Sequence, residues 1–389
     1  MTKAIALRAS IAIAGAVTLF GAPLAAEDLK FPSTVVWTAY DVGGSGYSQV
    51  VAIGSVLKNK YKVNVRILPG KNDVARLSPL RDDKASFSAT GSDSIYAQEG
   101  VFVFGNKQWG PQPIRILSLN VADGCAVAFT TAADSGAKTM QDLKGKPVAV
   151  VTSSPALTKA TEAMLAHANM TLKDVKVVPV SRVPQAIDVL IDGTAISTQN
   201  ASFSTHNKRL EASPRGVSYL PQPHADEAGW KRLKAIVLWY FKHKCMAGPG
   251  VPKEGYEGVG TGYPILVGMS RVNNDLAYNT TKAMYVHYDD YKGAAPGGNG
   301  WALDRQQLET YFLPFHEGAI KYYKEIGKWN AKAQANQDAN LARQKVLQDA
   351  WKAFVGNAPS DAKQFKDGWA KARGAALTAA KMDVVFPSW

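Results

Sequence analysis

Strand-like and helix-like segments alternate along the N-terminal part of this chain, and this order limits the fold more than any other feature. Short apolar or alternating runs predict strands, and longer stretches with helical periodicity lie between them. The expected strands are Val35–Thr38, Lys62–Leu68 and Lys84–Thr90, and the expected helices are Tyr47–Lys60 and Asp73–Arg81. This order predicts a mainly parallel sheet covered by helices.

A second α/β set follows, and the chain then changes character. Strands are expected at 114–120, 126–130, 147–151, 175–180 and 264–269, and helices at 156–169, 182–191 and 275–289. Residues 214–262 are rich in Gly, Pro and aromatics and give no clear assignment. From Trp329 the chain is rich in Ala, Gln, Lys and Asn, which predicts two helices, Asn330–Phe354 and Asp361–Lys381.

The N-terminus has the layout of a secretory signal peptide. Lys3 and Arg8 precede an apolar run at 11–20, and small residues at 22–26 lie before Glu27. The alternative is a retained membrane anchor, although the run is shorter than the roughly 20 residues that span a bilayer. We therefore expect residues 1–26 to be removed and the mature chain to reside in the periplasm.

The net charge and the two cysteines limit which kinds of partner and which compartment suit this protein. The formal net charge is +13, but the basic residues are dispersed, which favours a solvated basic surface over a nucleic-acid site. Cys125 and Cys245 can form one disulfide in an oxidising compartment or remain two buried thiols. The histidines lack metal-ligand spacing, so we expect no metal and no cofactor.

Polar loops between strand ends and helix starts are the main candidates for a binding site. A helix N-terminus offers unpaired N–H donors and a positive dipole end to acceptor groups. The alternative is ordinary capping of each helix. Aromatic residues flank the first loop, an arginine opens a later helix, and two amides follow a later strand. The candidate ligand-binding residues are Tyr40, Gly43, Gly44, Ser45, Tyr47, Ser92, Asp93, Thr152, Ser153, Ser154, Arg182, Gln199 and Asn200.

Catalytic patterns are weak in this sequence. Ser55 and Lys58 have the serine-x-x-lysine spacing of penicillin-recognising enzymes, but the partner motif with lysine, threonine and glycine is missing. No nucleophile elbow, zinc-protease motif or phosphate loop occurs. We expect a protein that is not an enzyme, and the alternative is an exported hydrolase that uses Ser55 or a carboxylate pair.

Several segments, taken in order, resemble the TAXI family of periplasmic solute-binding proteins, which serve TRAP-type transporters. The resemblance covers roughly residues 33–329, and the segments that carry it are Gly43, Gly44, Tyr47, Ser92, Asp93, Met140–Val151, Tyr263–Val267, Asp275–Asp290 and Leu313–Glu325. The chain departs from the family pattern at Ser48, at Val51, at 154–157 and in the polar segment 194–202. The resemblance implies a two-lobe fold that closes on a ligand, with the binding mode kept and the ligand changed.

The expected protein is thus an α/β chain with a two-lobe periplasmic-binding-protein fold (type II-like) and a helical C-terminal tail. Lobe I is expected at 33–121 and 265–329, lobe II at 122–264, and the helical extension at 330–389. The expected function is capture of a small organic molecule, implied to be a carboxylate, and delivery to the membrane permease of a TRAP transporter. The alternative partner is an ATP-driven importer or a sensor, and a monomer is expected.

Overall fold

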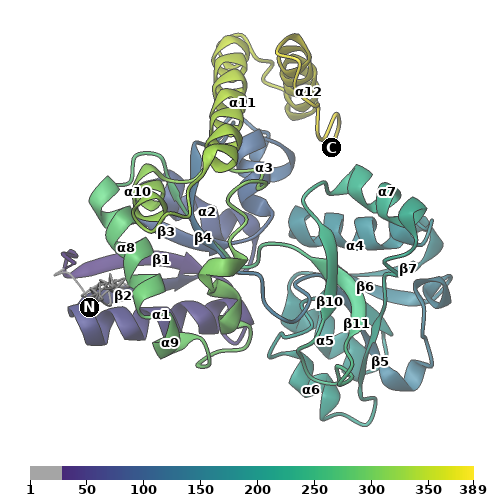
Figure 1. Ribbon diagram of the computed structural model, residues 1–389. Coiled ribbons are helices and arrows are strands. Elements are labelled where there is room, and N and C mark those ends of the chain that lie inside the picture. The colour runs from purple at the N-terminus through teal and green to yellow at the C-terminus, as the bar shows by residue number, and fades with distance from the viewer. Residues whose placement is uncertain (1–28) are drawn as a thin grey trace, which may run out of the picture.

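The computed structural model describes residues 29–389, so the expected signal peptide at 1–26 lies outside the described residues. The first sheet has the strand order β2-β1-β3-β12-β4, and we call the part of the chain around it lobe I (Figure 1). Its strands are β1 (Thr34–Ala39), β2 (Asn64–Pro69), β3 (Phe87–Thr90), β4 (Ile114–Leu119) and β12 (Ile265–Met269). Its helices are α1 (Ser45–Tyr61), α2 (Asp73–Arg81), α3 (Asp93–Glu99), α8 (Asn274–Val286), α9 (Tyr288–Tyr291) and α10 (Glu317–Glu325).

The second sheet repeats this plan in the order β7-β6-β8-β5-β9, and we call its surroundings lobe II. Its strands are β5 (Ala128–Ala132), β6 (Pro147–Val151), β7 (Lys176–Val180), β8 (Ser197–Asn200) and β9 (Val217–Leu220). Its helices are α4 (Pro155–His167), α5 (Val183–Ile191), α6 (Asn207–Glu211) and α7 (Glu227–Ile236). A separate antiparallel pair, β10 (Phe241–Cys245) and β11 (Tyr256–Gly260), covers one side of this lobe.

The two sheets are related by the way the chain crosses between them. In each sheet only the fourth strand of the order, β12 or β5, is antiparallel to its neighbours. Each of these strands is the one through which the chain enters from the other lobe. The segments 120–127 and 261–264 form the crossings. Two backbone hydrogen bonds join them: the Asn120 N–H donates to the Pro264 carbonyl at 2.9 Å, and the Tyr263 N–H donates to the Asn120 carbonyl at 2.8 Å. The expected two-lobe α/β fold, with mainly parallel sheets, is therefore confirmed.

The polar composition of β8 is explained by its neighbours in the sheet. All four residues of this strand, Ser197–Asn200, are buried. The hydroxyl of Ser197 lies 2.7 Å from that of Thr131 on β5, and the Thr198 hydroxyl donates to the carbonyl of Ala149 on β6 at 3.0 Å. Because each hydroxyl finds a partner inside the sheet, the strand is buried without unpaired hydroxyl groups at these two positions.

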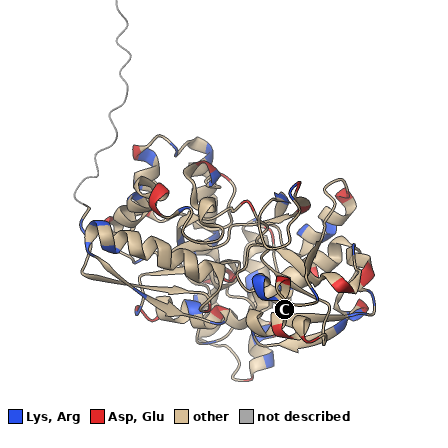
Figure 2. Cartoon of the chain, turned by 90° about the horizontal axis from the view of Figure 1, so that it is seen from below, with Lys and Arg blue, Asp and Glu red and all other residues tan. Residues whose placement is uncertain are grey.

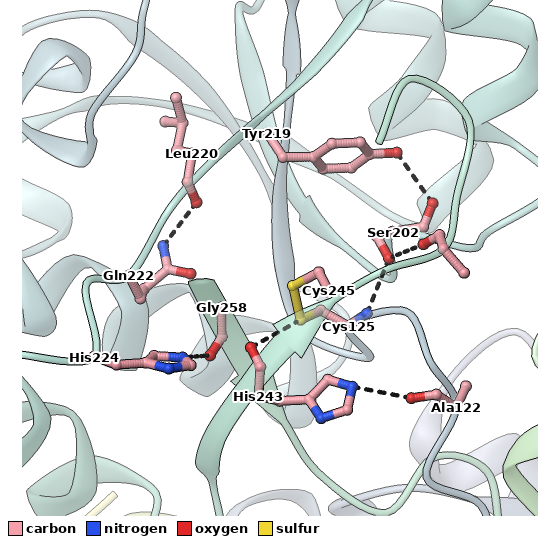
Figure 3. The surroundings of a disulfide bond; sticks show 11 residues. Ala122, Cys125, Ser202, Tyr219, Leu220, Gln222, His224, His243, Cys245 and Gly258 are labelled. Carbon is pink, nitrogen blue, oxygen red and sulfur yellow. Dashed lines mark hydrogen bonds between the residues drawn. A yellow bond between two sulfur atoms is a disulfide. The ribbon is translucent and has the colours of Figure 1, made fainter. Parts of the chain in front are cut away.

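A disulfide joins Cys125 to Cys245, which decides between the two states that the sequence left open. Cys125 lies in the first crossing segment and Cys245 ends β10, so the bond ties the β10–β11 pair to the crossing (Figure 3). Both residues are fully buried. Next to them the Ser202 hydroxyl accepts from the Cys125 N–H at 3.0 Å and donates to the Ala247 carbonyl at 2.7 Å.

The helices expected in the C-terminal tail are present as α11 (Ala331–Val355) and α12 (Ala362–Ala379). They pack on lobe I beside α3, where they stand above the first sheet in Figure 1. Glu99, at the end of α3, is buried and pairs with both Arg373 of α12 and Arg343 of α11. Although burial alone would raise it, the two ion pairs hold the pKa of Glu99 below its ordinary value.

Basic and acidic residues are scattered over both lobes in the cartoon of Figure 2. This distribution agrees with the dispersed basic residues of the sequence. Within residues 29–389, no helix combines the length and the apolar character that crossing a membrane requires.

Candidate functional site

A cavity of about 110 Å³ lies between the two lobes. Both lobes and both crossing segments contribute to its lining, and strand ends and helix starts from each lobe meet there. Two hydrogen bonds join the lobes across the cleft: the Thr205 hydroxyl of lobe II donates to the Gly43 carbonyl of lobe I, and the Ser154 hydroxyl of lobe II donates to the Asp73 carboxylate of lobe I. The volume has room for several water molecules or one small organic molecule.

Lobe I supplies the loops that follow β1 and β3. Tyr40, Gly44 and Ser45 come from the first loop, and Ser92 and Asp93 come from the second. Burial raises the pKa of Tyr40 well above its ordinary value, so its phenol stays protonated and can donate a hydrogen bond. The Ser92 hydroxyl accepts from the indole N–H of Trp239 at 2.9 Å, so a lobe II side chain reaches the lobe I wall.

Lobe II supplies the start of α4, the start of α5 and the end of β8. Gln199 and Asn200 end β8 and both line the cavity, but their side chains differ in their partners. Asn200 donates to Asn207 and accepts from the Ala201 N–H, each at 2.9 Å. The buried Oε1 of Gln199 has no hydrogen-bond partner among the described residues. An unpaired buried acceptor costs free energy, which a donor on a ligand would recover.

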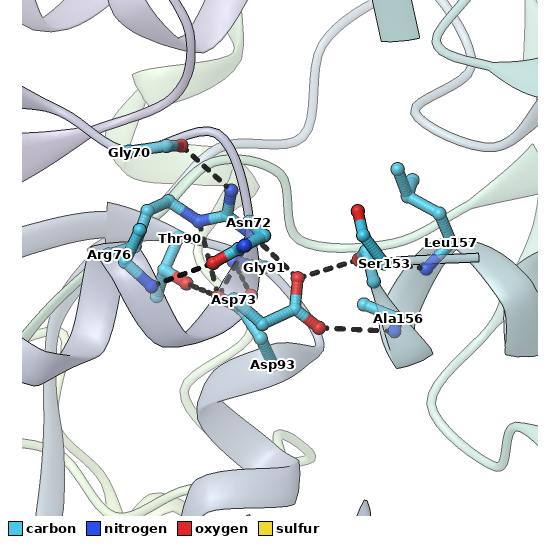
Figure 4. A network of polar contacts seen from close by, with 12 residues as sticks. Gly70, Asn72, Asp73, Arg76, Thr90, Gly91, Asp93, Ser153, Ala156 and Leu157 are labelled. Carbon is cyan, nitrogen blue, oxygen red and sulfur yellow. Dashed lines mark hydrogen bonds and ion pairs between the residues drawn. The ribbon is translucent and has the colours of Figure 1, made fainter. Parts of the chain in front are cut away.

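A network of charged groups adjoins the cavity, which two of its members, Arg76 and Asp93, line (Figure 4). Arg76 of α2 donates to Asp93 at 3.2 and 3.1 Å, to Asp73 at 3.0 Å and to the Gly70 carbonyl at 3.3 Å. Its guanidinium also lies 4.4 Å from the centre of the Tyr40 ring. The Asp93 carboxylate additionally accepts from the Thr90 hydroxyl and from the Gly91 N–H. Arg76 therefore holds two carboxylates.

The Asp73 carboxyl has a pKa raised to about 6, first because it is buried and second because Asp93 is close. A raised pKa means that the folded state binds a proton at Asp73 more tightly than the unfolded chain does. The stability that this proton contributes is fully present below the unfolded pKa and is lost as pH rises through about 6.

Asp73→Asn should therefore gain stability relative to the wild type, by roughly 1–3 kcal/mol, as pH rises from about 4 to about 7. Urea unfolding at several pH values measures this difference. Asp289→Asn is the matched control, because Asp289 pairs with Lys292 on the surface. Parallel curves for the wild type and Asp73→Asn over this pH interval would contradict the assignment.

The structure brings together most of the residues that the sequence pointed to. Nine of them line the cavity: Tyr40, Gly44, Ser45, Ser92, Asp93, Ser154, Arg182, Gln199 and Asn200. Thr152 and Ser153 are exposed outside it, and Gly43 and Tyr47 line a shallower hollow beside α1. Whether these residues bind a ligand stays a prediction.

Other residues at the cavity were not predicted from the sequence. Lys71 lies in the loop Gly70-Lys71-Asn72 after β2, and Arg76 lies in the helix α2 that follows it. This loop is a further polar loop at a strand end, and the same signal in the sequence points to it. Three further lining residues belong to the part of the chain where the sequence predicts no element. Tyr240 and Thr261 lie within the Gly- and Pro-rich segment 214–262, and Tyr263 directly follows it. Tyr263 packs against Tyr40 with ring centroids 5.0 Å apart.

Residues 38–327 match the sequence profile of the NMT1-like family. The alkanesulfonate-binding protein SsuA from Xanthomonas axonopodis pv. citri, bound to MOPS, is similar with a TM-score of 0.45 and 12% identity over 92% of this chain and 96% of that chain. The methionine-binding protein MetQ has a TM-score of 0.42 and 13% identity over 69% and 97%. The ligand-binding core of GluR0 with L-glutamate has a TM-score of 0.41 and 10% identity over 70% and 98%. No curated protein has a significant sequence match to the chain.

Proposed function

Because the chain belongs to the NMT1-like family, we propose that it is an extracytoplasmic solute-binding protein that captures one small organic molecule between its lobes. The observation that carries the proposal is the cavity between the lobes, which is lined from both lobes by buried hydroxyl, phenol and amide groups. Enclosure between two lobes suits capture and release, because only the closed state contacts a ligand on both sides.

A carboxylate is the ligand class that we propose. Two exposed cations line the cavity and form no ion pair with another described residue, Lys71 from lobe I and Arg182 from lobe II. A guanidinium can hold a carboxylate through two parallel hydrogen bonds. The resemblance to the TAXI family supports the same ligand class, and with it delivery to the permease of a TRAP-type transporter. An ATP-driven importer or a sensor is the alternative recipient.

The periplasm is the proposed location. The N-terminal sequence pattern supports it, and so does the disulfide, since such bonds persist in oxidising compartments.

The cavity groups favour binding over catalysis. Ser55, the expected nucleophile of the hydrolase alternative, donates to the Val51 carbonyl within α1 at 2.9 Å and is exposed. Asp73 and Asp93 do form a close carboxylate pair, but both are 0% exposed and their oxygens are occupied by Arg76 and neighbouring donors. A general acid or base must reach the proton that it transfers, which neither carboxylate can do in this arrangement.

Gln199→Ala should weaken binding of a carboxylate ligand that also carries a hydrogen-bond donor by about three- to a hundred-fold, because the Gln199 Oε1 can then no longer accept a hydrogen bond from that donor. A panel of small carboxylates screened by thermal shift supplies the ligand, and calorimetric titration measures its affinity. Gln141→Ala is the matched control, since Gln141 is an exposed glutamine of lobe II that does not line the cavity. If Gln199→Ala had a lower melting temperature but an unchanged ligand affinity, Gln199 would not be a ligand-binding residue.

A further inference from the structure

The carboxylate of Asp73 crosses from lobe I to the N-terminus of α4 in lobe II (Figure 4). Its Oδ1 accepts from the Ser154 hydroxyl at 2.6 Å, and its Oδ2 accepts from the Ala156 N–H at 3.2 Å. Ser154 is the N-cap residue of α4, so a side chain of the other lobe satisfies the first turn of this helix. Asp73 thus occupies a helix N-terminus of lobe II, a place that suits an anion.

Arg76 cannot offer a second anion site beside Asp73. Its Nε and Nη2 donate to Asp93, Nη2 also donates to Asp73, and Nη1 donates to the Gly70 carbonyl. The three charged groups carry one net negative charge, and all three side chains are buried. A further anion placed against this cluster would be repelled strongly, because buried charges are poorly screened.

The unpaired cations lie elsewhere on the cavity. Lys71 follows β2 in lobe I and Arg182 is the N-cap residue of α5 in lobe II, so the lining has one such cation on each side of the cleft. Asp41, also on the lining, adds a negative charge near His206, whose pKa is lowered by burial and which is therefore mostly neutral. The formal charges of the six charged residues named here sum to zero: Lys71, Arg76 and Arg182 are positive, and Asp41, Asp73 and Asp93 are negative.

We propose that Asp73 fills, from the protein's own chain, the position at α4 that a second ligand carboxylate would take, and so restricts the ligand to a single carboxylate group. This inference rests on the proposed capture of carboxylates. It makes Asp73 a specificity-determining residue that rejects dicarboxylates through a buried charge held directly behind the cavity-lining residues Arg76 and Ser154.

Matched pairs of ligands test the inference by the ratio of their dissociation constants within each pair. L-Glutamine with L-glutamate and succinamate with succinate differ by one carboxylate at nearly constant size. The wild type should bind the monocarboxylate at least about ten-fold more tightly than its partner. Asp73→Asn, which keeps the size and removes the charge, should bring the ratio within about three-fold.

Ser154→Ala separates charge from closure. It removes the 2.6 Å hydrogen bond from lobe II but leaves the Asp73 charge in place, so the wild-type ratio should persist even if both affinities fall. Circular dichroism melts establish that each variant is folded, and Asp73→Ser replaces Asp73→Asn if the latter does not fold.

Three results would overturn the inference while leaving carboxylate capture intact. These are a wild type that binds dicarboxylates at least as tightly, an Asp73→Asn ratio equal to that of the wild type, and a Ser154→Ala ratio that collapses as far as that of Asp73→Asn. A wild type that binds neither member of any pair would instead contradict the proposed ligand class, and the inference would fall with it.

Discussion

Arg373→Met should lower the free energy of unfolding by about 3–5 kcal/mol, the range seen when one partner of a buried ion pair is removed. Arg373 is 0% exposed, and its guanidinium donates to the Glu99 carboxylate and, at 3.2 Å, to the Glu99 carbonyl. Arg343 alone would then have to compensate the buried Glu99 charge. Because the pair joins α12 to α3, the substitution should also loosen the C-terminal helices from lobe I.

Chemical denaturation monitored by circular dichroism measures this effect. Lys363→Ala is the control on the same helix, since Lys363 pairs with Asp367 at the surface and such exposed pairs are worth at most about 1 kcal/mol. Limited proteolysis should cut the variant within 330–389 faster than the wild type. A loss below about 1 kcal/mol in Arg373→Met would show that the Glu99 cluster does not hold the extension in place.

Reduction of the disulfide should cost about 2–5 kcal/mol of unfolding free energy. The bond closes a loop with a sequence separation of 120, so the reduced unfolded chain gains considerable conformational freedom. It also anchors the β10–β11 pair to the crossing segment, and lobe II should therefore be destabilised first.

Unfolding curves with and without dithiothreitol measure the cost, and Cys125→Ala/Cys245→Ala should match the reduced wild type. The chain has two cysteines in all, so reductant acts on this bond only, and the double variant should not respond to it. Equal stability of the oxidised and reduced wild type would contradict the structural role of the bond.

Local signals were sufficient for most helices and strands. The expected helix Asp73–Arg81 coincides with α2, and the expected strand at 147–151 coincides with β6, because both have clear periodicity and turn residues at their ends. The segment 214–262 resisted prediction although it contains β9, α7, β10 and β11. Its strands are short, and β10 (Phe-Lys-His-Lys-Cys) is only partly buried, so hydrophobic periodicity is weak there.

Strand direction and charge pairing depend on contacts between distant parts of the chain. That β5 and β12 run antiparallel follows from the crossing between lobes, which no local pattern reveals. Polar loops at strand ends pointed to much of the cavity lining, since such loops meet at one edge of a sheet. Asp73 and Arg76 look like an ordinary surface pair three residues apart, and only the packing of β3, α3 and α4 against them makes the pair buried.

Native mass spectrometry tests the central claim, capture of one small carboxylate between the lobes, most directly. The protein taken from a periplasmic extract, or incubated with the carboxylate panel, should carry a mass excess equal to one organic acid per chain. That excess should disappear on denaturation and be reduced in Gln199→Ala. A chain that shows only its bare mass in both preparations would contradict the account.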